Sequence, residues 1–191
     1  MPNPKLKTRV WPVLALLLLI SSCGHREPAT SYTQAYLATL ETTESEPVST
    51  ETVKQFGDVF NHLQSADLAS IIDQVYADSF YFNDTFRTVT DKAALIAYLE
   101  ETGEAVHAIA VKIEDIAQSE QNRDVYVRWT MTMQFTVKGK LIESQSVGVT
   151  HLRYDDKGQI IVHHDYWDGV DGFYQHLPVM GFWLRKIRDQ L

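Results

Sequence analysis

The stretch Gln-Ile-Ile-Val-His-His-Asp-Tyr-Trp-Asp, residues 159–168, decides how the rest of the chain is interpreted. Its β-branched and aromatic residues predict the last strand of a sheet. It also gathers imidazole, carboxylate, phenol and indole groups that a purely structural strand does not need. Because side chains alternate along a strand, His163, Asp165 and Trp167 are expected on one face and His164 on the other.

A hairpin is expected to lead into this strand. Residues 148–154 form a second strand-like run, and Asp-Asp-Lys-Gly at 155–158 is a turn signal between the two. With residues 156 and 157 at the centre of the turn, Thr150 should lie opposite His163 and Gly148 opposite Asp165. The missing side chain of Gly148 would then leave space over Asp165.

Length and composition indicate one globular domain. The chain has 191 residues, of which 45% are hydrophobic and 22% charged, and both values are ordinary for such a domain. The formal net charge is −8, and beyond residue 22 the chain has 14 basic against 25 acidic residues. This acidic balance argues against nucleic-acid binding, which rests on a basic surface.

The first 22 residues have the features of a secretory signal peptide. A cationic start at residues 5–9 precedes an apolar run at 10–20, which is far shorter than the ~20 residues that span a bilayer. Ile-Ser-Ser-Cys at 20–23 resembles the bacterial lipobox, which implies cleavage before Cys23 and its lipidation. Several acyl chains would anchor the protein stably. The alternative is a plain signal peptide, or an uncleaved apolar N-terminus, with an incidental cysteine.

The lipobox resemblance also implies an address in the cell. Gly24 follows Cys23 in place of the aspartate associated with inner-membrane retention, so the outer membrane facing the periplasm is expected. Residues 23–50 are rich in Ser, Thr, Glu and Pro and would form a flexible tether between lipid and domain. A short helix around residues 34–40 is an option within it.

Two or three helices are predicted before the main sheet, with a short strand at residues 76–84 ahead of the third. Ser49 or Thr50 is a suitable N-cap for the first, whose apolar residues recur every three or four positions. Asp67 should cap the second. The third should begin at residue 90 or 91 and be closed by Gly103.

Beyond residue 103 the apolar period changes to two. The alternation from residue 127 to 137 predicts a long strand with one buried and one wet face, and the hairpin completes an antiparallel meander. The chain should end in a helix from about Val179, with basic residues near its negative C-terminal end. The residues of this helix expected to face inward are Met180, Trp183, Leu184, Ile187 and Leu191.

This order of elements resembles the nuclear transport factor 2-like (NTF2-like) superfamily, which includes the SnoaL-like polyketide cyclases and the ketosteroid isomerases. The resemblance covers about residues 51–167 and rests on Ser-Ala-Asp at 65–67, Tyr-Ala-Asp at 76–78 ahead of Asn-Asp at 83–84, Leu-Arg-Tyr-Asp-Asp-Lys-Gly-Gln-Ile at 152–160 and His-Asp-Tyr-Trp-Asp at 164–168. It implies an α+β, cystatin-like cone in which N-terminal helices and a curved antiparallel sheet enclose an apolar cavity. Many members pair through the outer sheet, so a homodimer is an option. The expected division is residues 1–22 signal peptide, 23–50 lipidated cysteine and tether, and 51–191 domain.

The functional residues of the two related families carry over differently. Alignment with the isomerases places Asp84 near their general base, but their tyrosine donor falls on Val59 and their protonated aspartic acid on Thr150. Because an oxyanion without such donors loses its main stabilisation, ketosteroid isomerisation is disfavoured. The His-Trp-Asp run of the cyclases aligns with residues 163–165. This alignment places Asp165 on their acid/base aspartate.

The predicted catalytic residues are therefore Asp165, His163 as the group that orients it, and Asp84. Burial in an apolar cavity raises the pKa of a carboxyl group and allows it to exchange a proton near neutral pH. The predicted ligand-binding residues are Trp129, Met131, Met133, Thr150, Tyr166 and Trp167. The alternative is that Asp165 and His163 only satisfy each other, and that Asp84 is a turn residue.

No cofactor is expected. The chain lacks a phosphate-binding glycine loop, and a metal site is disfavoured because neighbouring histidines alternate between faces. The leading expectation is an envelope lipoprotein that binds a small, largely apolar molecule, with isomerase-like or cyclase-like chemistry at Asp165 as a further step. The alternative is a non-catalytic interaction or dimerisation module, which predicts a collapsed cone without room for a ligand.

Overall fold

A computed structural model describes residues 31–190 of the chain. The predicted signal peptide, the predicted lipidation site Cys23, the start of the predicted tether and Leu191 lie outside the described residues. Within the described range, no helix is long and apolar enough to cross a bilayer.

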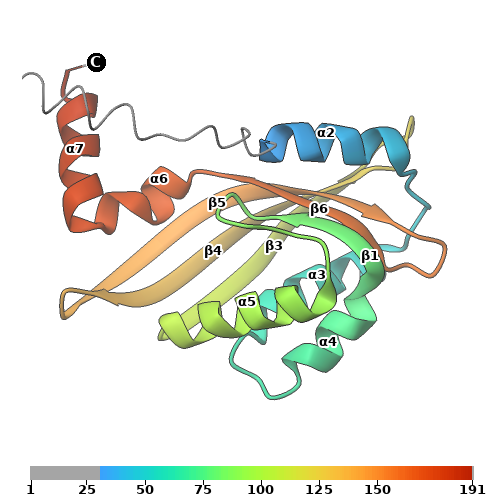
Figure 1. The fold of residues 1–191 in the computed structure, drawn as a ribbon, viewed down its shortest axis with the longest axis horizontal. Helices are drawn as coiled ribbons and strands as arrows, with labels where there is room; N and C mark the ends of the chain where they lie inside the picture. Colours follow the sequence, from blue (N-terminus) through green and yellow to red (C-terminus); the bar gives the residue numbers. More distant parts are fainter. Residues whose placement is uncertain (1–30, 191) are drawn as a thin grey trace, which may run out of the picture. The chain divides into compact units, whose positions relative to one another are not determined.

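Six strands form one curved sheet that does not close (Figure 1), in the order β2-β1-β6-β5-β4-β3. β1 runs parallel to β6, and all other neighbouring strands are antiparallel. The strands are β1 (Tyr76–Asn83), β2 (Thr88–Val89), β3 (Ala108–Gln118), β4 (Val125–Val137), β5 (Lys140–Tyr154) and β6 (Ile160–Trp167). The predicted α+β cone is confirmed, and its antiparallel meander is β3 to β6.

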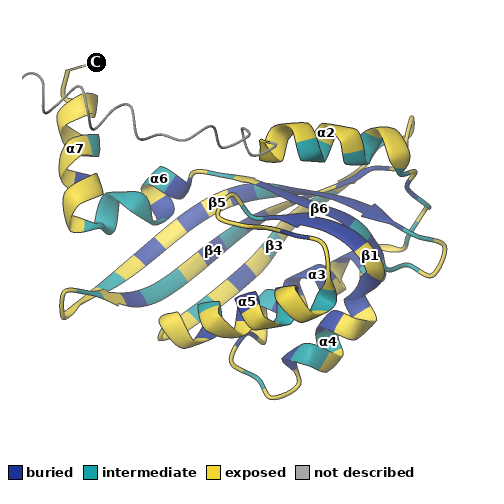
Figure 2. Ribbon diagram, in the orientation of Figure 1, coloured by how far each residue is buried: buried dark blue, intermediate teal, exposed yellow. Residues whose placement is uncertain are grey.

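Three helices cover the concave face of this sheet: α3 (Thr50–Asn61), α4 (Leu68–Val75) and α5 (Lys92–Ala105). The Ser49 hydroxyl accepts from the Thr52 amide at 3.1 Å and the Asp91 carboxylate from the Ala94 amide at 2.9 Å, so these two N-caps are confirmed. Asp67 occupies the N-cap position of α4 without a capping hydrogen bond. All three helices carry buried residues, and buried residues are dense in β1 and β6 (Figure 2).

Gly103 has a different role from the predicted one. It lies inside α5, which continues to Ala105, so it does not end the helix. A Cβ at this position would lie 2.6 Å from the backbone oxygen of Leu63. The glycine therefore allows α5 to pack closely against the chain that follows α3.

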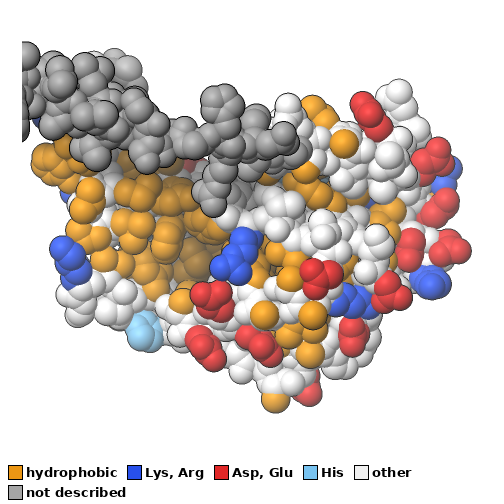
Figure 3. Space-filling view, viewed as in Figure 1, with side chains coloured by type: hydrophobic (Ala, Val, Ile, Leu, Met, Phe, Trp, Pro, Cys, Tyr) orange, Lys and Arg blue, Asp and Glu red, His pale blue; other side chains and the backbone are white. Residues whose placement is uncertain are grey.

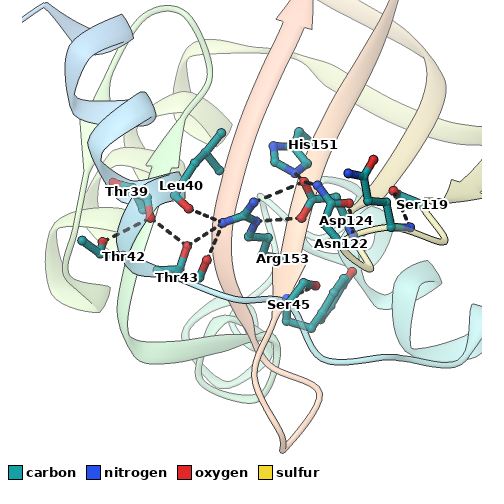
Figure 4. Close-up of polar contacts among 12 residues, drawn as sticks. Thr39, Leu40, Thr42, Thr43, Ser45, Ser119, Asn122, Asp124, His151 and Arg153 are labelled. Carbon is teal, nitrogen blue, oxygen red and sulfur yellow. Dashed lines mark hydrogen bonds and ion pairs between the residues drawn. The ribbon is translucent and has the colours of Figure 1, made fainter.

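The structure differs from the expected flexible tether over residues 32–48. Residues Tyr32–Thr42 form helix α2, which lies across the outer face of the sheet (Figure 1). The Tyr36 hydroxyl lies 2.6 Å from His151 Nδ1 on β5. The guanidinium of Arg153 donates to the backbone oxygens of Leu40 at 2.9 Å and Thr43 at 2.5 Å (Figure 4). This segment is thus packed on the domain by polar contacts.

The β5–β6 hairpin has a longer loop than predicted. Residues 155–159 all lie outside the strands, and Gly158 adopts a φ of 76° that favours glycine. The loop shifts the pairing by one residue, and an irregularity between Arg153 and Tyr154 shifts it by one more. Thr150 therefore pairs with Asp165 and Gly148 with Trp167, two residues from the expected register. Because the shift is an even number of residues, every side chain keeps its predicted face.

The C-terminal residues form α6 (Gly169–Gly172), a short 3₁₀ helix η1 (Tyr174–His176) and α7 (Pro178–Arg188). The helix is confirmed, but its predicted inward face is wrong. Met180 is 43% exposed, and Trp183 and Ile187 are each 54% exposed. Gly181 is the one residue of α7 that is buried. Periodicity identifies the apolar face of a helix without identifying what covers it.

Candidate functional site

An apolar cavity of about 530 Å³ lies between the concave face of the sheet and its covering segments. This volume is within the range of small-molecule sites. Figure 3 shows hydrophobic side chains gathered around a hollow on this side of the molecule. The apolar residues of the wall include Phe56, Phe60, Leu63, Phe86, Leu99, Ile109, Trp129, Met131, Met133, Phe135, Trp167, Phe173 and Leu177.

Asp165 on β6 contributes a carboxylate to this wall and is only 8% exposed. Its Oδ1 accepts a hydrogen bond from the Thr150 hydroxyl at 2.5 Å and lies 3.1 Å from His163 Nε2. Its Oδ2 accepts no hydrogen bond from any residue that the structure describes. One carboxylate oxygen is therefore fixed by the protein, and the other remains available to a ligand.

The direction of the hydrogen bonds to Asp165 follows from the chemistry of the partners. The indole N–H of Trp129 can only donate, and it donates to the Thr150 oxygen at 2.8 Å, so the Thr150 hydroxyl is left to donate to Asp165. An ionised carboxylate only accepts, which assigns a proton to His163 Nε2. Trp129 and Thr150 thus orient Asp165 from the side of β4 and β5.

His163 is wholly buried and is held from its other nitrogen by Tyr76. The Tyr76 hydroxyl lies 2.7 Å from His163 Nδ1, and the rings of Phe56 and Phe82 pack against the imidazole. Burial and the nearby Asp165 raise the pKa of Tyr76, which keeps its hydroxyl protonated as a donor. His163 is not part of the cavity wall, so its predicted orienting role fits its position.

Asp84 is both a turn residue and part of the cavity wall. One carboxylate oxygen accepts from the backbone amides of Phe86 at 3.0 Å and Arg87 at 2.9 Å, which makes Asp84 a turn residue. The other accepts from the Tyr98 hydroxyl of α5, and the side chain also faces the cavity. Burial raises the pKa of Asp84, although the Tyr98 and backbone hydrogen bonds lower it.

The predicted ligand-binding residues divide into three groups. Trp129, Met131, Met133 and Trp167 line the cavity as expected. Thr150 is fully buried and supports Asp165. The prediction for Tyr166 is wrong. This side chain is 49% exposed on the outer face, next to Tyr36 and His164, so it does not line the cavity.

The prediction that Gly148 leaves open space over Asp165 is also wrong. A Cβ at Gly148 would lie 2.3 Å from the Trp129 ring, so the indole occupies the room that the glycine leaves. The residue that Gly148 faces across the hairpin is Trp167. Gly148 therefore lets the Trp129 ring pack into the cavity wall, in the position from which its indole N–H donates to Thr150.

The polar wall residues that sequence reasoning missed are Arg87, Tyr98, Glu101, Thr102 and Thr136. Tyr98 lies among the apolar residues of the third predicted helix, and its hydroxyl was the available signal. Arg87 also lines the cavity, with its guanidinium 4.8 Å from the Tyr98 ring centroid and 3.5 Å from the Glu101 carboxylate. Nothing in the local sequence distinguishes Arg87 from an ordinary turn residue.

The histidines occupy the faces that alternation predicted. His163 faces inward with Asp165, whereas His151 and His164 face α2 on the outer side. Within residues 31–190, no group of three or more His, Cys, Asp or Glu side chains is placed to hold a metal ion.

A model of the SnoaL-like domain matches residues 53–163. The chain belongs to the SnoaL-like domain family. The matched range of this SnoaL-like protein contains Asp84 and His163 and ends two residues before Asp165. No curated protein sequence matches the chain.

Solved structures share the fold at low sequence identity. A protein assigned as a SnoaL-like polyketide cyclase from Shewanella putrefaciens is 20% identical, with a TM-score of 0.53 over 65% of this chain and 94% of that one. Its counterpart from Shewanella denitrificans is 18% identical, with a TM-score of 0.53 over 64% and 94%. An NTF2-like protein of unknown function from an Exiguobacterium species is 17% identical, with a TM-score of 0.51 over 61% and 98%. These similarities establish the NTF2-like fold of the SnoaL-like protein.

Proposed function

We propose that this protein is an envelope lipoprotein whose SnoaL-like domain binds a small, largely apolar molecule and transfers a proton at Asp165 without a cofactor. One observation carries the proposal: a carboxylate oxygen without a partner among the described residues faces an apolar cavity of about 530 Å³. A cavity of this kind with a few convergent polar groups is the usual form of a small-molecule site. The lipid anchor at Cys23 rests on the lipobox resemblance.

In this proposal Asp165 acts as the general base. Its Oδ2 takes a proton from an acidic C–H or O–H of the ligand, while Thr150 and His163 hold the other oxygen in place. Asp84 lies in the same wall, and its raised pKa allows it to hold a proton nearer neutral pH than an exposed aspartate does. The two carboxyl groups could then remove and return a proton at different ligand atoms, as an isomerisation or cyclisation requires.

The alternative, an interaction module without a ligand, predicts a collapsed cone. The open apolar cavity counts against it, because protein interiors are close-packed and rarely keep unfilled space of this size. Partner binding at α7 is compatible with a ligand in the cavity and is considered separately below.

The proposal is tested by native mass spectrometry of the full chain after incubation with a lipid and metabolite extract of the producing cells. We expect a retained small molecule in the wild type and in Tyr166→Phe, whose substitution lies on the outer face of β6. Trp167→Ala should lose the molecule, because it removes an aromatic part of the wall. Wild-type protein that retains nothing from the extract would contradict ligand binding.

Proton transfer has a separate readout. The retained molecule, incubated with protein in deuterated water, should gain deuterium at the exchanged position in the wild type and in Tyr166→Phe. Asp165→Asn should bind the molecule and leave it unlabelled, because the amide is not a base. Equal labelling by Asp165→Asn would rule out Asp165 as the proton-transfer group and leave a binding protein.

A further inference from the structure

The C-terminal helix α7 presents an apolar face that no described part of the protein covers. Val179, Trp183 and Ile187 are four residues apart and therefore share one side of the helix. They are 70%, 54% and 54% exposed. Gly181 projects from roughly the opposite side of the helix, where a Cβ would lie 2.0 Å from the backbone oxygen of Gln175. The helix is thus fixed to η1 through one side, and its apolar side points outward.

The charge of α7 differs from that of the protein as a whole. Arg185, Lys186 and Arg188 lie in its last turn, and none of them forms an ion pair with a residue that the structure describes. The ammonium of Lys186 lies 5.4 Å from the Trp183 ring centroid. The chain as a whole has a net charge of −8. A basic patch beside an exposed tryptophan on an acidic protein favours a negatively charged, partly apolar partner.

We infer that α7 docks on an anionic lipid surface, with Val179, Trp183 and Ile187 in the acyl boundary and Lys186 beside Trp183 at the headgroups. Arg185 and Arg188 lie nearer the Gly181 side of this thin helix and add electrostatic attraction to the same surface. An apolar face that includes tryptophan beside basic residues is the pattern of helices that lie in the membrane interface. At 11 residues, α7 is too short to span a bilayer, so it lies parallel to the surface. Because the rest of the protein is acidic, an anionic surface repels it, and α7 is the region that makes contact.

Docking through α7 also has a consequence for the cavity, which rests on the proposed function. Phe173 and Leu177 belong to the cavity wall, and Leu177 immediately precedes α7. A docked α7 therefore holds this part of the wall close to the bilayer. The cavity ligand is then expected to be a lipophilic molecule that exchanges with the membrane.

The test places an environment-sensitive nitrobenzoxadiazole label on α7 of the full chain. The label is attached at Val179→Cys in a Cys23→Ser background, so that it has a single attachment site. Val147→Cys, at an equally exposed position on β5, is the control and reports whether the whole domain lies on the membrane. Vesicles contain phosphatidylcholine and phosphatidylglycerol in equal parts, or phosphatidylcholine alone.

With anionic vesicles, the α7 label should shift to the blue and be quenched by spin-labelled acyl chains, and the β5 label should not. Arg185→Gln, Lys186→Gln and Arg188→Gln together should lower the ratio of inserted to free label on the order of a hundredfold, from ~1 kcal/mol per basic residue near the surface. Trp183→Ser with Ile187→Ser should abolish acyl-chain quenching. Circular dichroism confirms that the variants are folded.

Three outcomes would overturn the inference. The first is an α7 label that stays in water with both vesicle types, and the second is equal insertion into neutral and anionic vesicles. The third is a label shift that depends on protein concentration without vesicles, which indicates self-association through α7. The Trp167→Ala variant separates this inference from the proposed function, because it should lose the cavity ligand and keep the insertion of α7.

Discussion

Strands β5 and β6 carry two buried polar clusters, one on each face of the sheet, and the two differ in one respect. The outer cluster consists of Tyr36, Asp124, His151, Arg153 and His164, and the inner cluster of Tyr76, Thr150, His163 and Asp165. In the outer cluster both oxygens of the Asp124 carboxylate are engaged by the protein. In the inner cluster one oxygen of Asp165 faces the cavity without a described partner.

This difference separates a cluster whose carboxylate is engaged within the protein from one whose carboxylate is free for the ligand of the proposed function. Arg153 donates to Asp124 at 2.7 Å and 3.3 Å and also to the backbone oxygens of Leu40 in α2 and Thr43 just after it (Figure 4). The ring of Tyr36 stacks on that of His164 with centroids 4.1 Å apart. Helix α2 thus covers the outer cluster, whereas the inner cluster opens onto the cavity at Asp165.

The largest expected effect on stability comes from removing the Asp124 carboxylate from the outer cluster. Asp124→Ala leaves the Arg153 guanidinium buried beside His151 without a counter-charge. We expect the free energy of unfolding to fall by about 3–5 kcal/mol, measured by urea denaturation followed by circular dichroism. Glu46→Gln, which removes an exposed ion pair to Arg123, is the control and should cost less than about 1 kcal/mol. Equal effects would mean that the outer cluster does not stabilise the fold.

The two tyrosines allow a matched comparison, because each bonds a histidine Nδ1, Tyr36 on the outer face and Tyr76 on the inner face. Tyr76→Phe leaves His163 with an unsatisfied nitrogen in a fully buried position, which should cost about 1–3 kcal/mol. Tyr36 is only partly buried, so Tyr36→Phe should cost about 0.5–1.5 kcal/mol. Urea denaturation measures both. A larger loss of stability in Tyr36→Phe than in Tyr76→Phe would contradict this prediction.

The outer cluster should also make the protein sensitive to acid. Burial lowers the pKa of His164 to about 4, so the folded protein holds this imidazole neutral. Its contribution to stability is complete above the unfolded pKa of about 6.5 and is lost as the pH falls towards the folded pKa. We expect a loss of roughly 1–2 kcal/mol between about pH 7 and pH 4.5, reduced from the ideal value by solvent screening.

Denaturant unfolding of wild type and His164→Phe at the two pH values isolates this contribution. The carboxyl groups and the other histidines are the same in both proteins. The difference between the two pH profiles therefore measures the contribution of His164. A variant with the same pH dependence as the wild type would show that His164 is not the group responsible.

The faces of the two clusters could be predicted from sequence, whereas their partners could not. Alternation placed His163, Asp165 and Trp167 together because a strand has a period of two whatever the length of its turn. The register was missed because residues 155–159 form a loop around Gly158 and the pairing is irregular between Arg153 and Tyr154, and composition reveals neither feature. The predicted faces were still correct, because the register error was an even number of residues.

The covering segments were harder to predict for a physical reason. The contacts of α2 join residues more than a hundred positions apart, such as Tyr36 and His151, and they are polar, so its local apolar pattern is weak. Arg87 and Tyr98 reach the cavity from a turn and a helix, and no local rule links them to Asp165. The apolar face of α7 was visible in the sequence, but its exposure depends on the packing of Gly181 against Gln175.

The smallest expected effect is also the sharpest test of the comparison. Asp165→Asn and Asp124→Asn make the same isosteric change on opposite faces of the sheet. Asp124→Asn loses a charged acceptor of the Arg153 guanidinium and should cost about 1.5–3 kcal/mol. Asp165→Asn keeps an oxygen for the Thr150 hydroxyl and removes a charge from an apolar cavity, so stability should stay within about 1 kcal/mol of wild type or rise. Urea denaturation near neutral pH measures both variants. If Asp165→Asn proved as destabilising as Asp124→Asn, the protein would need the Asp165 charge for its own structure, and the inner carboxylate would no longer be the group left free for a ligand.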